Sequence, residues 1–513
     1  MTDVRIITEP LGGSSLSRAI QSRAVENWLA AAPSGPGAWQ EQAGRRARER
    51  DWASLWRCLE PALAARGAAR DRLTRVISAN GVVVTTGQQP GLFGGPIYTL
   101  SKAVSAIALA GAVERATGVP TAPVFWAATD DADFAEASST AVARRGGLDI
   151  LRATNAPPAG TPMALASLGD VGEQLNRLAA ACGSAADPRA LAAVRAAYTE
   201  GGTSTTIGEA FVRLMRSLLE PLGMAVIDAS HDAVADASVP TLERSLAAAT
   251  EIERALKARS TEIRGAGFDA QVEDVTGLSL VFAREGSTKR RLAVGELPAS
   301  GARLTPNVLL RPIVEREILP TVAYVAGPGE LAYFAQVAPV ADALGVGAPV
   351  AVPRWSCTVL EPHVAALLKR FQTSAEELAA EGALESRLAH AALDGGAKDA
   401  LSRLRATLAA LPEWLRDSAE RLDLERAVQG AAGAMLHRAD RLERRLVAAM
   451  KHREHEAMTD VATLRAALRP RGERQERVLN PIPTLARHGL TLLDEMTDAA
   501  RPHADSIVTG DVR

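Results

Sequence analysis

Glycines gather between two predicted elements in the segment 82–105, VVVTTGQQPGLFGGPIYTLSKAVS. The valines are typical of a buried strand, and small apolar residues at helical spacing after Lys102 indicate a helix. The glycines between them are Gly87, Gly91, Gly94 and Gly95. Glycines let the backbone approach a ligand, and amides at a helix start favour phosphate or carboxylate, to which Lys102 would add a full charge. Because the spacing fits neither GxGxxG nor GxxxxGKS/T, a tight turn without a ligand is the alternative.

Three aspartates follow another predicted strand, Ala122–Ala128. They are Asp130, Asp131 and Asp133. Carboxylates just past a buried strand suit an ammonium group or a hydrated Mg²⁺ ion. Aspartate also favours the first turn of a helix, so a capped helix start explains the same residues without a ligand.

A second glycine-rich turn, Gly327-Pro328-Gly329-Glu330, follows a predicted strand that ends near Val325. Tyr333 and Gln336 stand three and six residues after Glu330, which puts all three on one face of a helix. They would contact a sugar or an amino acid, or form only a polar helix start. The other polar candidates are Asn307, Arg311 and Arg354.

Strands alternate with amphipathic helices after residue 80, which predicts parallel pairing through crossovers and a doubly wound sheet. Ligands bind beyond the carboxyl ends of the strands in such sheets. The loop after Thr85 and the aspartates after Ala128 both fall at those ends. We therefore expect the two segments to face one crevice.

The order of these patterns predicts an α/β core that two insertions interrupt. We assign residues 1–143 to the first part of the core, 144–205 to a small insertion, 206–361 to the second part of the core with a connecting insertion, 362–469 to a helical coiled coil, and 470–513 to a C-terminal segment that returns to the core.

The coiled-coil assignment depends on a leucine pattern with alternating steps of three and four residues. Its members are Leu401, Leu404, Leu408, Leu411 and Leu415. Pro412 should break or restart the helix. A seam between two chains and a helical hairpin within one chain both explain the pattern.

Composition limits the class of protein without choosing one. The 513 residues are too many for one core, and 58 Lys and Arg against 60 Asp and Glu point to neither nucleic acid nor a membrane surface. Cys58, Cys182 and Cys357 lack the spacing of a disulfide framework or a zinc site, which fits a reducing cytoplasm. The longest small apolar run, Ala103–Val113, is far shorter than a bilayer span, so we predict no membrane segment.

Four segments, in order along the chain, resemble the BshC family, the cysteine-adding enzymes of bacillithiol biosynthesis. They are GQQPGLFGGPIYTLSKA at 87–103, PVFWAATDDADFAE at 123–136, NVLLRPIVEREILPTVAYVAGPGELAYFAQ at 307–336 (followed by Val352-Pro353-Arg354) and RQERVLN at 474–480. The resemblance covers most of the chain. It implies a Rossmann-like doubly wound parallel-sheet core with helical insertions, and a long C-terminal α-helical coiled coil that joins two chains as a homodimer.

The resemblance also implies a cytoplasmic ligase that adds cysteine through an amide bond to the amino group of glucosaminyl malate. Because a free carboxylate acylates an amine too slowly, ATP would activate the cysteine carboxyl and leave as ADP or AMP, with Mg²⁺ as a companion. The implied catalytic residues are Asp130, Asp131, Asp133 and Lys102, with no dedicated metal ligands. The implied binding residues are Gly87, Gln88, Gln89, Gly91, Gly94, Gly95, Asn307, Arg311, Gly327, Gly329, Glu330, Tyr333, Gln336 and Arg354.

One departure from the family's pattern concerns histidine. Relatives read close to EDHDFDE at the aspartates and carry another histidine shortly after, whereas this chain has Ala132 and Ser139 at those places. Two functions therefore stay open. The first is the ligase, and the second is a diverged dimeric protein of the same fold that binds a nucleotide or a sugar without ligating anything.

Overall fold

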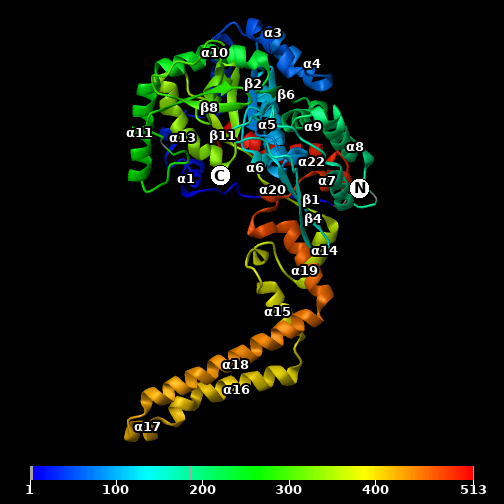
Figure 1. Cartoon of the computed structure of the whole chain (residues 1–513), viewed down its shortest axis with the longest axis vertical. Coiled ribbons are helices and arrows are strands. Elements are labelled where there is room, and N and C mark those ends of the chain that lie inside the picture. Colours follow the sequence, from blue (N-terminus) through cyan, green and yellow to red (C-terminus); the bar gives the residue numbers. More distant parts are fainter. Residues whose placement is uncertain (1–3, 185, 274, 512–513) are drawn as a thin grey trace. The chain divides into compact units, whose positions relative to one another are not determined.

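The computed structural model describes residues 4–184, 186–273 and 275–511, and Figure 1 shows their helices and strands. The chain forms two compact units. Unit 1 comprises the described residues of Met1–Val142, Ile150–Leu360 and Glu476–Arg513, and unit 2 comprises Ala143–Asp149 and Glu361–Gln475. Unit 1 therefore collects the two ends of the chain around one core, and unit 2 holds the long helical region.

The centre of unit 1 is a five-stranded parallel sheet in the order β11-β10-β2-β3-β6. Its strands are β2 (Val82–Gln88), β3 (Thr121–Ala127), β6 (Ala225–Asp228), β10 (Thr321–Ala326) and β11 (Ala351–Pro353). The chain first adds β3 and β6 on one side of β2 and then β10 and β11 on the other. This order confirms the predicted doubly wound parallel sheet.

Successive residues of β2 face opposite helical layers, because side chains alternate along a strand. Val82 and Val84 pack into the first layer, and Val83 packs into the second. The first layer consists of α2 (Pro36–Arg48), α5 (Ile97–Thr117), α9 (Ile207–Leu219) and α22 (Leu492–Thr509), and the second of α3 (Trp52–Leu63) and α4 (Gly67–Ser78). The sheet is thus covered on both faces, as a run of three buried valines requires.

Helix α5 is the core helix of unit 1. Its 21 residues, with a mean hydropathy of 1.3, are long and apolar enough to cross a membrane. The sequence analysis considered only the shorter run Ala103–Val113 and predicted no such helix. However, 83% of that apolar window is buried in the protein. Its length and composition serve the packing between the sheet and α22.

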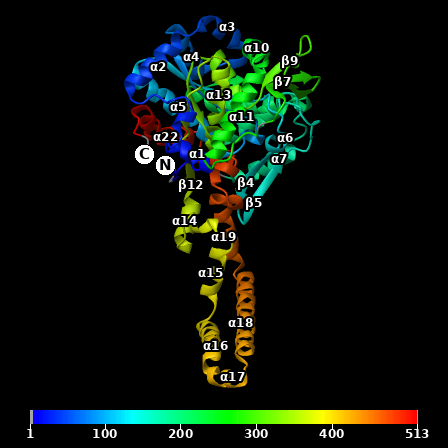
Figure 2. The same cartoon turned by 90° about the vertical axis from the view of Figure 1, so that its left-hand side faces the viewer.

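Three smaller sheets complete the described strands. They pair β1 (Arg5–Thr8) with β12 (Cys357–Leu360), pair β4 (Ser139–Arg144) with β5 (Gly147–Arg152), and join β8 (Thr288–Ala293), β7 (Leu278–Glu285) and β9 (Arg303–Pro306) in that order. The last sheet is antiparallel, and Figure 2 labels β7 and β9. It brings basic residues to the site described below.

Further helices join these elements, and two of them, η5 and η6, belong to unit 2. They are α1 (Ser15–Gln21), α6 (Phe134–Ala137), α7 (Gly172–Cys182), α8 (Pro188–Thr199), α10 (Asp232–Ala247), α11 (Ala249–Gly265), α12 (Arg311–Ile318), α13 (Pro328–Ala343), α20 (Gln475–Val478), α21 (Ile482–His488), η1 (Glu26–Trp28), η2 (Leu92–Gly94), η3 (Gly202–Ser204), η4 (Glu220–Leu222), η5 (Glu377–Ala379) and η6 (Pro470–Gly472). The segment 144–205, which the sequence analysis sets apart as an insertion, lies in unit 1 from Ile150 onward.

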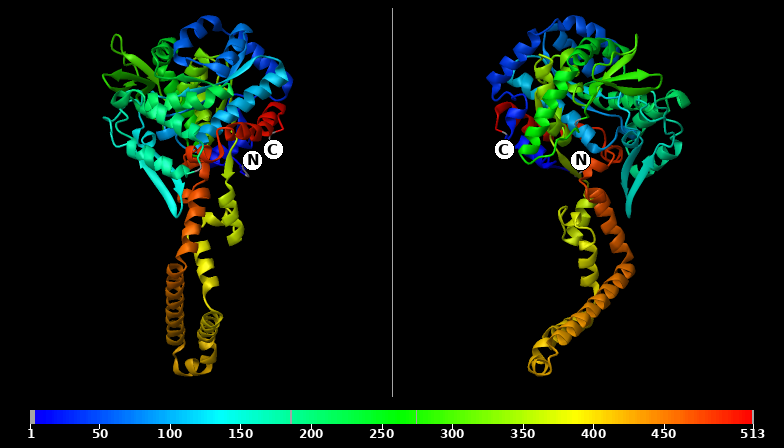
Figure 3. Two further views of the ribbon diagram at one scale, coloured as in Figure 1. Left: turned by 90° about the vertical axis from the view of Figure 1, so that its right-hand side faces the viewer. Right: turned by 60° about the vertical axis from the view of Figure 1, so that its left-hand side comes forward.

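Unit 2 is built from α14 (Pro362–Phe371), α15 (Ala383–Ala392), α16 (Gly395–Trp414), α17 (Arg416–Leu422), α18 (Glu425–Arg453) and α19 (His455–Leu468). Helices α16 and α18 lie side by side as a hairpin (Figures 2 and 3). Leu401 is buried there, whereas Leu404 and Leu415 are exposed. The predicted leucine pattern therefore serves the hairpin only in part.

Pro412 does not break α16 where the sequence suggested. The helix continues through Pro412 and ends at Trp414. A proline removes the one hydrogen bond that its N–H would give to the carbonyl four residues earlier, here that of Leu408. In the last turn of a helix this loss is small, so the break falls two residues later than predicted.

Candidate functional site

A cavity of about 910 Å³, called the main cavity below, opens at the carboxyl ends of β2 and β3. The strand order reverses between β2 and β10, and the crevice at such a reversal is where doubly wound sheets bind ligands. The predicted site residues that line it are Gly87, Gln88, Gln89, Lys102, Asp130, Asp131, Asp133, Asn307, Arg311, Gly329, Glu330 and Tyr333. The structure thus brings parts of both glycine turns and the aspartates to one cavity.

Lys102 lies in α5, and its ammonium group contacts protein atoms at the cavity wall. Nζ lies 2.6 Å from Glu330 Oε2 and donates to the carbonyl of Gly87 at 2.7 Å and to Gln88 Oε1 at 2.9 Å. An ammonium group has three protons, so these contacts use them all. Lys102 therefore joins α5 to the end of β2 and to the start of α13.

Glu330 completes this junction from the first turn of α13. Its Oε2 also accepts from the Gly327 amide at 2.7 Å, and its Oε1 accepts from the Tyr324 hydroxyl at 2.6 Å. Burial alone would raise the pKa of this carboxyl, but Lys102 and Arg311 outweigh burial and lower the pKa below its ordinary value. Glu330 is therefore a carboxylate that four neighbouring groups hold in place.

Arg311, the first residue of α12, is the second buried cation of the site. Nη1 lies 2.9 Å from Glu315 Oε2, and Nη2 donates to the hydroxyls of Tyr324 and Tyr333 at 3.1 Å each. Burial raises the pKa of Glu315 to about 7, although Arg311 opposes it. These contacts use three of the five N–H groups of a guanidinium, so Arg311 keeps donors for a ligand.

Two cations that the sequence analysis missed reach the main cavity from β8. Lys289 Nζ donates to the Asp130 carbonyl at 2.6 Å, and Arg291 Nε donates to the Ser279 carbonyl. Neither forms an ion pair with a carboxylate in the part of the chain that the structure describes. Their charges are available to an anionic ligand. Side chains alternate along a strand, so Lys289 and Arg291 share one face of β8, while Arg290 between them points away and pairs with Glu296. This alternation is the sequence signal that could have identified the two cations.

The three aspartates have different surroundings. Asp133 Oδ1 accepts from the Glu136 amide at 3.1 Å and caps α6, and Asp131 Oδ1 accepts from the Asp133 amide at 2.7 Å. Asp131 and Asp133 therefore form the capped helix start that was one of the two predicted alternatives. The carboxylate of Asp130 has no hydrogen bond with another described residue. Burial raises the pKa of Asp130, which Lys289 opposes and Asp131 reinforces, so this carboxylate suits a proton acceptor.

A chain of polar side chains connects the main cavity to its rim. Gln88 Nε2 donates to the Tyr98 hydroxyl at 3.2 Å, which donates to Glu136 Oε1 at 3.1 Å. Because Gln88 Oε1 already accepts from Lys102, both ends of its amide are fixed. Glu136 also lines the cavity, and the sequence analysis did not single it out.

The other glycines of the first turn, Gly91, Gly94 and Gly95, lie in a buried turn that contains η2. The Gly94 amide donates to the Gly91 carbonyl at 3.0 Å, and the Gly95 amide to the Leu92 carbonyl at 3.2 Å. A Cβ on Gly91 would lie 2.6 Å from the Gly95 Cα. The turn itself thus requires glycine here, and the two amides donate to protein carbonyls.

Asn480 holds this turn from the C-terminal segment. Its Nδ2 donates to the carbonyls of Leu92 at 3.4 Å, Phe93 at 3.0 Å and Gly95 at 3.2 Å. Phe93 has a φ of +52°, a left-handed conformation that costs a non-glycine residue about 1–3 kcal/mol. Its ring packs against Tyr198 with centroids 4.8 Å apart. The resemblance at RQERVLN therefore includes a residue that fixes the glycine turn.

The remaining predicted residues support the cavity walls. Gln336 is buried, donates to the Val272 carbonyl at 2.8 Å and accepts from its amide at 3.0 Å, which fixes a segment that lines the cavity. Arg354 forms a buried ion pair with Glu476 at 2.7 Å. Gly327 is the N-cap of α13. Across residues 4–184, 186–273 and 275–511, no three His, Cys, Asp or Glu side chains are placed to hold a metal ion.

Comparison with protein families places both parts of the chain in one family. Residues 20–296 and 292–355 match the family model described as the N-terminal Rossmann-like domain of bacillithiol biosynthesis BshC. Residues 357–507 match the model described as its C-terminal coiled-coil domain.

Comparison with curated proteins gives relatives of similar length. The chain is 30% identical to a protein of Solibacter usitatus over 83% of this chain and 84% of the relative. It is 30% identical to a protein of Koribacter versatilis over 85% of both chains, and 32% identical to one of Heliobacterium modesticaldum over 85% of this chain and 84% of the relative. All three carry the name "Putative cysteine ligase BshC".

The turn fixed by Asn480 gives a stability prediction. Asn480→Asp replaces two N–H donors with an acceptor that faces three carbonyls, so we expect the free energy of unfolding to fall by about 3 kcal/mol or more. In the control, Asn307→Asp, the side chain only accepts, from the amides of Leu309 and Leu310, and we expect a change below about 1 kcal/mol. Urea unfolding measures both. Equal losses would show that donation by Asn480 does not hold the turn.

Proposed function

Because the chain belongs to the bacillithiol biosynthesis BshC family, we propose that it is a ligase that joins the carboxyl group of cysteine to the amino group of glucosaminyl malate. The names of the relatives support the cysteine ligase part of the proposal. The observation that carries it in this chain is the carboxylate of Asp130, which has no hydrogen bond with another described residue, while the Lys289 ammonium donates to the backbone carbonyl of the same residue. Amide formation requires a base and a cation at the same place.

The proton balance of the reaction assigns a role to Asp130. The amine of glucosaminyl malate arrives as an ammonium ion and must lose a proton to become a nucleophile. In this proposal Asp130 accepts that proton. The nitrogen then attacks the activated carboxyl carbon of cysteine, so the C–N bond forms while the bond to the leaving oxygen breaks. The leaving group takes that electron pair together with the second proton, which the nitrogen loses as it becomes an amide, and Lys289 lies beside Asp130 to stabilise the charge on the leaving oxygen.

Activation of the cysteine carboxyl requires a phosphate donor, and ATP is the proposed one. The unpaired charges of Lys289 and Arg291 and the spare donors of Arg311 suit phosphate oxygens. The amides of Gly94 and Gly95, which the sequence analysis offered for this role, donate to protein carbonyls instead. A Mg²⁺ ion in the main cavity would take most of its ligands from phosphate oxygens and water, as this ion commonly does.

The ligase proposal is tested with the purified full chain, glucosaminyl malate, cysteine, ATP and Mg²⁺, by mass spectrometry of the product. We expect bacillithiol to form. We expect Asp130→Asn to lower kcat by about 10²–10⁴-fold, the usual contribution of a general base. Asp71→Asn, at an exposed position of α4, is the matched control and should behave as the wild type. If the wild type forms no product, the ligase proposal is wrong and the diverged binding protein becomes the better description. If Asp130→Asn is as active as the wild type, only the role of Asp130 as the base is wrong.

The charges around Asp130 predict opposite shifts of the pH profile. The base must be deprotonated, so activity falls as the pH drops through the pKa of Asp130, which burial raises. Lys289 lowers this pKa, so Lys289→Met should move the acidic limb of kcat/KM to higher pH. Asp131 raises it, so Asp131→Asn should move the limb to lower pH. Shifts of the same sign in both variants would exclude Asp130 as the titrating group.

We further propose that unit 2 joins two chains as a homodimer. Leu404 on α16 and Leu442 on α18 are 40% and 48% exposed, so their packing within one hairpin is incomplete. The variant Leu404→Glu/Leu442→Glu should reduce the mass in sedimentation equilibrium from two chains to one chain of 53.9 kDa. Leu297→Glu, at an 86% exposed apolar residue of unit 1, is the control and should remain dimeric. A double variant that stays dimeric would place the seam elsewhere.

A further inference from the structure

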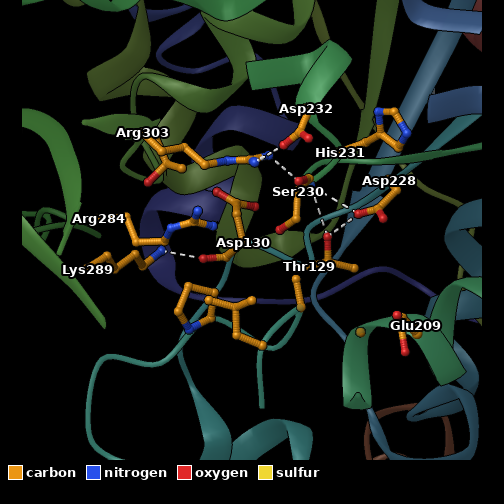
Figure 4. A pocket seen from close by; sticks show the side chains of 15 residues that line it. Thr129, Asp130, Glu209, Asp228, Ser230, His231, Asp232, Arg284, Lys289 and Arg303 are labelled. Carbon is orange, nitrogen blue, oxygen red and sulfur yellow. Dashed lines mark hydrogen bonds and ion pairs between the residues drawn. The ribbon is translucent and has the colours of Figure 1, made fainter. Parts of the chain in front are cut away.

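A second cavity of about 300 Å³, called the side cavity below, lies at the carboxyl ends of β3 and β6 (Figure 4). It shares Asp130 and Lys289 with the main cavity. Its other charged walls include Asp228 at the end of β6 and Arg284 on β7. The two cavities therefore meet at one carboxylate and one ammonium group.

One side of the side cavity is cationic. Figure 4 shows Arg284 and Lys289 on the same side as Asp130. Among the described residues, the Arg284 guanidinium has neither a hydrogen bond nor an ion pair. The residue is nevertheless partly buried. A guanidinium presents a planar fork of donors that matches the two oxygens of a carboxylate. This side is therefore suited to a carboxylate.

The opposite side carries an acid and hydroxyl groups. Oδ1 of Asp228 accepts from the Thr129 hydroxyl and from the Ser230 amide, the latter at 3.0 Å. Oδ2 of Asp228 accepts from no residue that the structure describes. The Thr305 hydroxyl also lines the cavity, from β9 beside the strand that carries Arg284, and it has no hydrogen-bond partner among the described residues. The unused oxygen of Asp228 suits an ammonium ion, which has three protons to donate.

A third cation of the side cavity, Arg303, belongs to its wall. Its guanidinium pairs with Asp232 and donates to the Ser230 carbonyl. These contacts attach β9 to the start of α10. Among the cations of this cavity, Arg284 thus differs from Arg303 in that it has no carboxylate partner in the described part of the chain.

We propose that the side cavity binds the free amino acid substrate as a zwitterion, with its carboxylate at Arg284 and Lys289 and its ammonium group at Asp228. This inference rests on the proposed ligase function, in which cysteine supplies the carboxyl group. A simple anion would leave Asp228 without a counter-charge, and a simple cation would leave Arg284 without one. A molecule with both charges at its two ends matches both sides of the cavity.

The size of the side cavity agrees with this assignment. At about 300 Å³ it lies at the small end of the range of ligand pockets, which suits a ligand as small as an amino acid. The main cavity has about three times that volume and suits the larger substrate. The two substrates would then occupy separate cavities on either side of Asp130.

The orientation of the amino acid has a chemical consequence. Its carboxylate lies at the wall that the two cavities share, and its ammonium and thiol groups lie farther from the main cavity. An amine in the main cavity therefore meets the carboxyl carbon first. Asp130 is in place to accept the proton from that amine, and the amino group of cysteine is held away from it by Asp228.

Binding of three small thiols tests the orientation. Equilibrium dialysis of the full chain, with a non-hydrolysable ATP analogue present, compares L-cysteine with cysteamine, which lacks the carboxylate, and 3-mercaptopropionate, which lacks the amine. We expect the wild type to prefer cysteine to both. Arg284→Met should weaken cysteine binding about ten- to hundredfold and remove its advantage over cysteamine. Asp228→Asn, which still accepts from Thr129, should remove its advantage over 3-mercaptopropionate.

A matched control separates this effect from a general loss of charge. Arg290 lies on β8 and pairs with Glu285 and Glu296 outside both cavities. Arg290→Met should bind cysteine as the wild type does. Binding of glucosaminyl malate should be unchanged in Arg284→Met, because that substrate occupies the main cavity, and an unchanged melting temperature would show that the variant is folded.

Two outcomes would overturn the inference in distinguishable ways. If Arg284→Met and Asp228→Asn both bind cysteine as the wild type does, the amino acid lies elsewhere, while the ligase proposal stands. If the wild type binds neither cysteine nor glucosaminyl malate, the ligase proposal and the inference that rests on it are both wrong.

Discussion

The buried ammonium group of Lys102 is the constraint around which the site is organised. A buried lysine in the second turn of a core helix must have its charge matched and its protons accepted, because an isolated buried charge costs several kcal/mol. Glu330 supplies the charge, and the end of β2 supplies the oxygens. To meet this need, α5, β2 and α13 must approach one point. The main cavity lies where they meet, so the same contacts fix the positions of its walls.

The sequence predicted the sheet and most of the cavity because both follow from local patterns. A run of β-branched residues marked β2 and a short apolar segment marked β3, and ligand sites lie at the carboxyl ends of parallel strands. These patterns predict that the glycine loop and the aspartates face one crevice, and both line the main cavity. The same patterns could not separate the residues of the glycine turn by role. Gly87 lines the cavity, whereas Gly91 serves the turn, and only the neighbouring backbone shows the difference.

Long-range pairing explains what local patterns missed. Lys102 looked like a free donor, but its partner Glu330 is distant in sequence. Arg311 also looked free, but it pairs with Glu315 in its own helix and donates to Tyr324 and Tyr333. Lys289 and Arg284 were overlooked because the register of a three-stranded antiparallel sheet decides which way their side chains point. The local conformation around Asp133 was foreseen as one of two alternatives, a capped helix start, and Asp131 and Asp133 adopt it while Asp130 stays free.

The contacts of Asn480 also have a consequence for the order of events during synthesis. The carbonyls that it holds lie 385 to 388 residues earlier in the chain. Ribosomes add about 5–20 residues per second, so the turn waits roughly 20–80 s for the amide that closes it. The core of unit 1 therefore stays incomplete until the helices of unit 2 have been made. During that interval the nascent chain exposes apolar core surface, which makes it a client for chaperones until the last segment arrives.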